Sequence, residues 1–115
     1  MNQEEHNIQA ACVRWFALQW PEYRGLLFAV PNGGARSKAT AGRLKAEGVV
    51  AGVADLILLV PKQWAFAICI EMKTAKGRQS PEQKEWQAKV EAQGYRYAVC
   101  HSIDEFIDTI NGYLK

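Results

Sequence analysis

Hydrophobic and polar positions follow helical spacing in some parts of the chain and form short apolar runs in others. Helical spacing and capping signals predict helices over residues 4–19, 37–47, 81–93 and from Ser102 to near the C-terminus. The apolar runs predict strands over residues 26–30, 55–60, 64–73 and 95–100. The predicted order of elements is therefore α-β-α-β-β-α-β-α.

This order predicts an α/β domain whose central mixed β-sheet is flanked by helices. Residues 55–60 and 64–73 have too short a connection for anything but an antiparallel hairpin, whereas the last two strands, joined through a helix, should be parallel with a right-handed crossover. The run Leu56–Val60 is apolar without alternation, which predicts a strand covered on both faces. With 115 residues, the chain has the length of one domain, over residues 1–115.

Composition narrows the class of protein. The N-terminal sequence is polar and no apolar run reaches transmembrane length, so we expect a soluble cytoplasmic protein that does not contact a membrane. Cys12, Cys69 and Cys100 are odd in number, widely spaced and set among apolar residues. We interpret them as reduced core residues rather than as disulfides or a zinc site.

Positive charge is concentrated in two segments. The formal net charge is only +2, but Lys and Arg gather in residues 36–45 and 73–84, and the remainder of the chain is net acidic. Such a distribution suits a polyanion, because phosphate contacts dominate nucleic-acid binding. Two solvated loops that are basic by chance explain the charge equally well.

Asp55, Glu71 and Lys73 form the most informative group of polar residues. Symmetric pairing of a hairpin centred near Gln63 sets Asp55 opposite Glu71, where Cβ atoms lie about 4.5–5.5 Å apart. Alternation along the strand puts Lys73 on the side of Glu71 and turns Met72 away. Two carboxylates beside an ammonium suit metal-assisted hydrolysis of a phosphodiester, although an ordinary cross-strand charge pair at a sheet end has the same pattern. Asp55 favours the first interpretation, because a charged residue directly before an apolar run needs a partner or a ligand.

Two further polar residues allow both a site role and a structural role. Glu5 and Gln9 continue the apolar stripe of the first helix, so Glu5 either faces the site or is a solvated acid in the first turn, where the helix dipole favours it. Ser80-Pro81-Glu82-Gln83 is a capping box, and capping by itself explains Gln83.

The residues around this site resemble a known group of nucleases. Gly52-Val53-Ala54-Asp55-Leu56 followed by Glu71-Met72-Lys73 resembles the PD-(D/E)XK nuclease superfamily, with Ala54 where that superfamily usually has Pro. Over nearly its whole length the chain is similar to the VRR-NUC (virus-type replication-repair nuclease) branch in the order of these short motifs: Glu5 with Gln9, Pro31-Asn32-Gly33-Gly34, Glu47-Gly48, Gly52, Glu71-x-Lys73, Ser80 with Gln83, and Gly94-Tyr95. The resemblance implies a restriction-endonuclease-like PD-(D/E)XK fold.

The resemblance also implies a role for each site residue. A divalent cation would be bound by Asp55, Glu71 and the backbone carbonyl of Met72. Such hard oxygen donors suit Mg²⁺, with Mn²⁺ as a substitute, rather than zinc. Lys73 would orient or activate the attacking water. The catalytic set would be completed by Glu5, which would reach the metal directly or through water, and by Gln83.

The activity implied is that of a Mg²⁺-dependent endodeoxyribonuclease that cleaves branched DNA such as Holliday junctions, in DNA repair or in a phage, as a homodimer. Candidate DNA contacts are the backbone N–H groups of Asn32, Gly33 and Gly34 and the charged side chains of Arg36, Lys38, Arg43, Lys76 and Arg78. Two alternatives stay open. One is a simple duplex-nicking phage nuclease, and the other is a non-catalytic nucleic-acid-binding module on the same fold.

Overall fold

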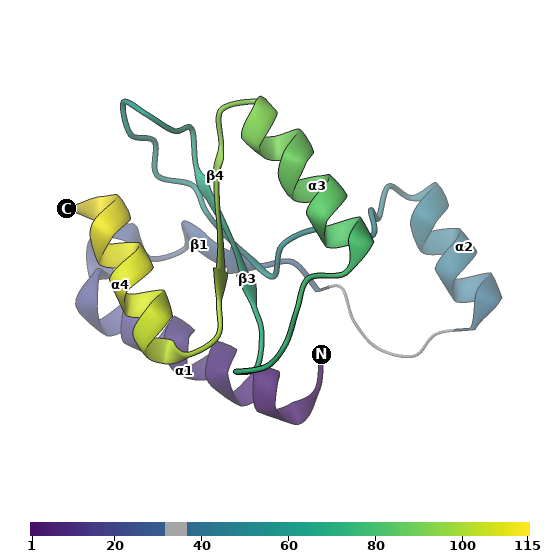
Figure 1. Ribbon diagram of the computed structural model, residues 1–115, viewed down its shortest axis with the longest axis horizontal. Coiled ribbons are helices and arrows are strands. Elements are labelled where there is room, and N and C mark those ends of the chain that lie inside the picture. Colours follow the sequence, from purple (N-terminus) through teal and green to yellow (C-terminus); the bar gives the residue numbers. More distant parts are fainter. Residues whose placement is uncertain (32–36) are drawn as a thin grey trace.

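The structure is a computed structural model that describes residues 1–31 and 37–115. Its elements follow in this order: α1 (Gln3–Gln19), the short 3-10 helix η1 (Pro21–Tyr23), β1 (Leu27–Ala29), α2 (Lys38–Ala46), β2 (Leu56–Leu58), β3 (Ile68–Met72), α3 (Pro81–Ala92), β4 (Arg96–Cys100) and α4 (Ile103–Leu114) (Figure 1). Apart from η1, this is the order that the sequence predicts, and the α/β class is confirmed.

The helices begin and end at residues that the sequence marks. Ser37, Ser80 and Ser102 cap α2, α3 and α4, since each hydroxyl oxygen accepts a backbone N–H from the first turn of its helix. Gly48 and Gly94 follow α2 and α3 with φ of +105° and +96°, a conformation that stops a helix and favours glycine.

Four strands form one mixed sheet in the order β1-β2-β3-β4. The β1–β2 and β2–β3 pairs are antiparallel and the β3–β4 pair is parallel, as the connections predict. Leu56 pairs with Ile70 and Leu58 with Ile68, which is the symmetric register expected of the hairpin. Both strands are shorter than predicted, and in the segment between them Lys62 and Ala65 pair as an isolated bridge.

One face of the sheet is covered by α1 and α4, and the hydrophobic core lies between these helices and the strands (Figure 1). Side chains alternate along each strand, so every second residue points into this core. Its most deeply buried apolar members are Cys12, Leu56, Leu58, Ile70, Met72, Cys100, Phe106 and Ile110. The cysteines are buried free thiols, as predicted.

The opposite face of the sheet is covered only in part. α3 lies over this face, where its Trp86 packs edge-on against Tyr97 of β4. Over β1 and β2 apolar side chains stay in solvent, with Phe28 40% and Leu59 50% exposed. The prediction that the Leu56–Val60 strand is covered on both faces is therefore wrong, because within the described residues a helix layer lies on only one side of it.

α2 lies apart from the sheet and from the other helices (Figure 1). None of its residues is buried. Its polar and basic sequence accounts for this position, since it offers little apolar surface to a core. Among the helices that the structure describes, none combines the length and hydropathy that a membrane span requires.

Candidate active site

Asp55 lies directly before β2 and is held by both neighbouring strands. Its backbone carbonyl accepts the N–H of Val30, next to β1, at 2.9 Å. Its Oδ2 accepts the N–H of Met72 in β3 at 2.7 Å. Continued by one residue, the β2–β3 register sets Asp55 opposite Glu71, as the sequence predicts.

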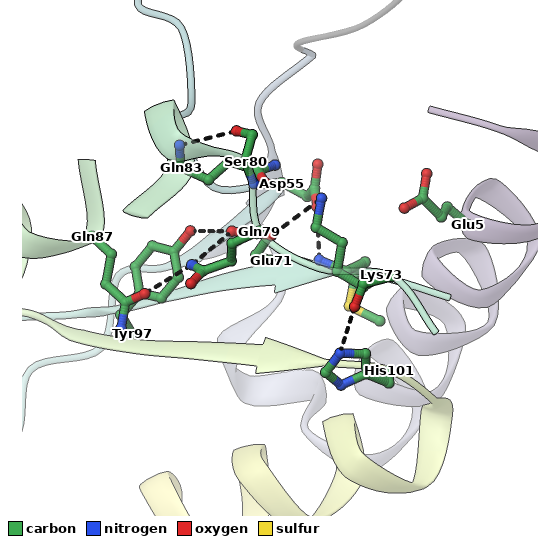
Figure 2. Close-up of polar contacts among 12 residues, drawn as sticks. Glu5, Asp55, Glu71, Lys73, Gln79, Ser80, Gln83, Gln87, Tyr97 and His101 are labelled. Carbon is green, nitrogen blue, oxygen red and sulfur yellow. Dashed lines mark hydrogen bonds and ion pairs between the residues drawn. The ribbon is translucent and has the colours of Figure 1, made fainter. Parts of the chain in front are cut away.

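Glu71 is the buried charge of the site, with no exposed surface in a strand whose other residues are apolar. A buried carboxylate needs donors or an opposite charge. Its Oε1 accepts hydrogen bonds from the Tyr97 hydroxyl at 2.5 Å and from the Gln79 amide at 3.3 Å (Figure 2). Its Oε2 lies 3.4 Å from the Lys73 ammonium, and no hydrogen-bond donor among the described residues reaches it.

Lys73 lies on the same side of β3 as Glu71, while Met72 between them is buried in the core, which confirms the predicted alternation. Its backbone N–H donates to the carbonyl of Cys100 at 2.9 Å and fixes this end of the strand. The side chain is only 15% exposed, so solvent screens its charge less than that of a surface lysine. An ammonium placed in this way can stabilise charge on a phosphate or orient a water.

Electrostatics at the site oppose a second negative charge. Burial raises the pKa of Asp55 above its ordinary value of 3.8, and the charges of Glu71 and Glu5 raise it further. The N–H of Met72 and the ammonium of Lys73 act in the opposite direction without cancelling the increase. A cation beside Asp55 and Glu71 would therefore be stabilised by the negative charge of these carboxylates, which the nearby donors and Lys73 do not fully offset.

An open cavity of about 650 Å³ lies over this pair of strand ends. Several separate parts of the chain line it, and its charged and amide side chains include Glu5, Gln9, Asp55, Lys73 and Gln83. Glu71 is too deeply buried to line the cavity, whereas its neighbours Met72 and Lys73 do so. The size of the cavity leaves room for a phosphate group with its water, beside the charged side chains on its wall.

The position of Glu5 is compatible with both interpretations of the sequence. It is half-buried in the first turn of α1, lines the cavity and lies near enough to Asp55 to raise the pKa of that carboxyl. Its own carboxylate also accepts the N–H of Asn2 at 3.3 Å as part of a capping box.

Gln83 forms the predicted capping box at the start of α3. Its Oε1 accepts the N–H of Ser80 at 2.7 Å, and the Ser80 hydroxyl accepts the N–H of Gln83 at 3.2 Å. The residue also lines the cavity. Because the cap uses the side-chain oxygen, it does not engage the side-chain NH₂ group.

The donor set fits a hard divalent cation. Asp55 directly precedes β2 and Glu71 lies in the adjacent β3, and no hydrogen-bond donor among the described residues reaches the buried Oε2 of Glu71. Carboxylate and carbonyl oxygens are the ligands that Mg²⁺ and Mn²⁺ prefer. Within residues 1–31 and 37–115 no three His, Cys, Asp or Glu side chains converge as a metal-binding group, so Glu5 lies beside the pair rather than in one cluster with it.

Tyr97 and Gln79 are contacts of the site that the sequence analysis missed. Both donate to Glu71, from β4 and from the loop before α3. A weak signal existed, because Tyr97 is a polar-tipped residue within an apolar run of the predicted strand. Recognising its partner required the β3–β4 register, which pairs Cys69 with Tyr97.

The basic residues that were predicted to contact DNA divide into two groups. Lys38 and Arg43 are exposed on α2, and Lys76 and Arg78 are exposed in the loop that joins Lys73 to α3. The remaining predicted contacts lie outside the described residues: Asn32, Gly33, Gly34 and Arg36.

Comparisons with known proteins show what this chain is similar to in sequence and fold. A family model described as VRR-NUC domain matches residues 3–104. A solved structure described as a VRR_NUC domain protein is similar with a TM-score of 0.83 and 25% sequence identity, over 99% of this chain and 90% of that chain. None of the curated proteins gives a significant match.

Proposed function

Because the chain belongs to the VRR-NUC family of nucleases, we propose that it is a metal-dependent endonuclease that hydrolyses phosphodiester bonds of DNA. The observation that carries the proposal is the pairing of Asp55 with Glu71 at the ends of β2 and β3, beside Lys73 and an open cavity. When bound there, Mg²⁺ or Mn²⁺ would supply polarisation of a phosphoryl oxygen and a lowered pKa of water.

Each residue of the site has a task in this proposal. Asp55 and Glu71 hold the cation, with the backbone carbonyl of Met72 as a further ligand. Lys73 orients the attacking water and stabilises negative charge that develops on the phosphate. Two cavity residues, Glu5 and Gln83, bind water or phosphate oxygens from the walls.

DNA binding is proposed to depend on the basic residues near the cavity. Lys76 and Arg78 lie in the loop that begins after Lys73, a residue of the cavity wall, so a duplex with its scissile phosphate in the cavity would pass over this loop. Lys38 and Arg43 of the protruding α2 would contact the backbone farther from the cut. Arg36 and the turn residues Asn32, Gly33 and Gly34 are proposed to join them.

Branched DNA such as a Holliday junction is the proposed substrate, and a two-fold homodimer the proposed active form. A domain of 115 residues offers little surface for several DNA arms, and a second copy doubles that surface. The open apolar face supports a partner, because Leu26, Phe28 and Leu59 lie on one side of the β1–β2 ladder and are exposed, with no helix among the described residues over them.

Cleavage of fluorescent DNA substrates tests the proposal. We expect the wild type to cut a four-way junction faster than a nicked duplex, an intact duplex or single-stranded DNA in Mg²⁺, and to cut nothing in EDTA. Glu71→Gln should lower the rate about 10³-fold, since it removes a charged ligand worth several kcal/mol in the transition state. Glu85→Gln is the matched control, because Glu85 is 72% exposed on α3. Light scattering of the same preparation gives the oligomeric state.

The same substrates separate the alternatives. Preferred cutting of a nicked or intact duplex would favour a duplex-nicking enzyme over a junction nuclease. A wild type that binds the junction and cuts no substrate under any divalent cation would leave only the nucleic-acid-binding module. Full activity of Glu71→Gln would refute the assignment of the active site.

A further inference from the structure

The two oxygens of the Glu71 carboxylate have unequal surroundings (Figure 2). Oε1 accepts hydrogen bonds from Tyr97 at 2.5 Å and from Gln79 at 3.3 Å. Oε2 accepts none from the described residues and lies 3.4 Å from the ammonium of Lys73, a residue of the cavity wall. Donors on one oxygen restrict rotation of the carboxylate, so the other oxygen keeps one direction.

Tyr97 reaches Glu71 because β3 and β4 are parallel. The register pairs Cys69 with Tyr97 and Glu71 with Val99. Tyr97 and Glu71 therefore lie on the same face of the sheet, on neighbouring strands and offset by two residues. Trp86 of α3 packs against the Tyr97 ring with centroids 6.1 Å apart and restricts its position. The ring is thereby held where the Tyr97 hydroxyl donates its hydrogen bond to Oε1 of Glu71.

Gln79 has its NH₂ group fixed between two acceptors. Its Nε2 lies 3.3 Å from Oε1 of Glu71 and 2.8 Å from Oε1 of Gln87 in α3. The Gln87 amide in turn donates to Glu91 at 3.3 Å. Turning the Gln79 amide over would lose both of its hydrogen bonds, so this chain of amides connects Glu71 to α3 in one arrangement.

We propose that Tyr97 and Gln79 are positioning residues that hold Oε1 of Glu71, so that Oε2 is presented to a divalent cation. The inference rests on the proposed function, in which Glu71 is a metal ligand. Both residues act through Glu71 rather than on the phosphate. Removing a hydrogen bond from a metal-ligating side chain typically costs about 10–100-fold in metal affinity or activity.

Tyr97→Phe tests the proposal, because it removes the hydroxyl and keeps the ring that packs against Trp86. Titration calorimetry with Mn²⁺ on DNA-free protein should give an affinity about 10-fold below that of the wild type. In cleavage assays the Mn²⁺ concentration for half-maximal rate should rise by a similar factor, while the rate at saturating Mn²⁺ falls much less. A purely structural defect would not separate these two quantities.

Two further variants make the test specific. Gln79→Met keeps the length of the side chain without its donors and should weaken Mn²⁺ binding in the same direction. Tyr95→Phe is the matched control, because Tyr95 is an exposed tyrosine next to the same strand whose ring packs against Phe66 rather than near Glu71. It should bind Mn²⁺ as the wild type does, and circular dichroism should show the same fold for all variants.

The outcomes distinguish this inference from the proposed function. Equal Mn²⁺ affinity of Tyr97→Phe and wild type overturns the inference, as does an equal loss in Tyr95→Phe or a wild type that binds no Mn²⁺. A wild type that binds Mn²⁺ but cuts no DNA, with weaker binding in Tyr97→Phe, supports the positioning role and refutes the nuclease. Cleavage by a wild type whose Mn²⁺ affinity does not depend on Tyr97 refutes the positioning role alone.

Discussion

At the scale of one residue, Asp55 belongs to the candidate site and, when ionised, lowers the stability of the folded protein. The raised pKa means that the folded protein holds the Asp55 proton more tightly than the unfolded chain does. At low pH, where Asp55 is protonated in both states, it therefore does not lower the free energy of unfolding. As the pH rises above 3.8 and the carboxyl ionises, the free energy of unfolding falls. The physical cause is the burial of one carboxylate beside another.

We expect Asp55→Asn to be more stable than the wild type and inactive. The amide oxygen of Asn can still accept the N–H of Met72, while the charge that Glu71 opposes is gone. In EDTA at pH 7 the Tm should rise by about 3–6 °C, the shift that about 1 kcal/mol produces in a domain of this size. Scanning calorimetry should show the gain shrinking as the pH falls towards 3.8. A Tm at pH 7 equal to or below that of the wild type would contradict the prediction.

At the scale of elements, the approach of Gly52 to α3 positions one wall of the cavity. Gly52 has φ of +83°, and a Cβ built on it would lie 2.4 Å from the carbonyl oxygen of Glu82 and 2.9 Å from the backbone nitrogen of Gln83. These atoms belong to the first turn of α3, which carries Gln83. A glycine is therefore required both by the backbone conformation and by the space available.

Gly52→Ala is expected to lower the free energy of unfolding by about 1–3 kcal/mol, because the strained φ and the contact with backbone cannot both be relieved locally. The α3 N-terminus should move away, and cleavage activity should fall with it. Gly112→Ala in α4 is the control, since nothing lies within 4 Å of its Cβ position. That variant should be neutral or more stable by up to about 1 kcal/mol in urea unfolding. Equal stability of Gly52→Ala and wild type would show that α3 is not held by this approach.

The arrangement of some elements could be predicted from the sequence, and that of others could not. The β2–β3 register could be predicted because hairpin pairing is local and nearly symmetric about Gln63, and this placed Asp55 opposite Glu71. The hydrogen-bond partners of Glu71 could not be predicted in this way, since Tyr97 and Gln79 reach Glu71 only through the packing of β4 and α3 on β3. No local period encodes such contacts. The exposed side of β2 was missed for the same reason, because an apolar run does not say what covers it.

At the scale of the whole molecule, the small net charge conceals an uneven distribution. The chain carries +2, yet the described basic side chains of α2 and of the loop after Lys73 stand in solvent without a salt bridge among the described residues. That loop is fixed to the segment between β4 and α4, since His101 Nε2 lies 3.2 Å from the carbonyl oxygen of Gly77. A polyanion would thus meet positive charge in a fixed place beside the cavity.

Salt dependence of DNA binding tests this distribution directly. Each lysine or arginine that neutralises a phosphate contributes about 0.9 to the slope of log affinity against log salt concentration. The double variant Lys76→Ala, Arg78→Ala should therefore bind duplex DNA more weakly in EDTA and lower that slope by about 2, uniformly across DNA sequences. Lys89→Ala is the matched control, because Lys89 lies in the last turn of α3, pairs with Glu85 at 3.5 Å and is 72% exposed. Fluorescence anisotropy at several salt concentrations measures all three proteins. An unchanged slope in the double variant would place the DNA away from this loop. An equal change of slope in Lys89→Ala would show that the net charge of the protein determines binding, rather than the position of the charge beside the cavity.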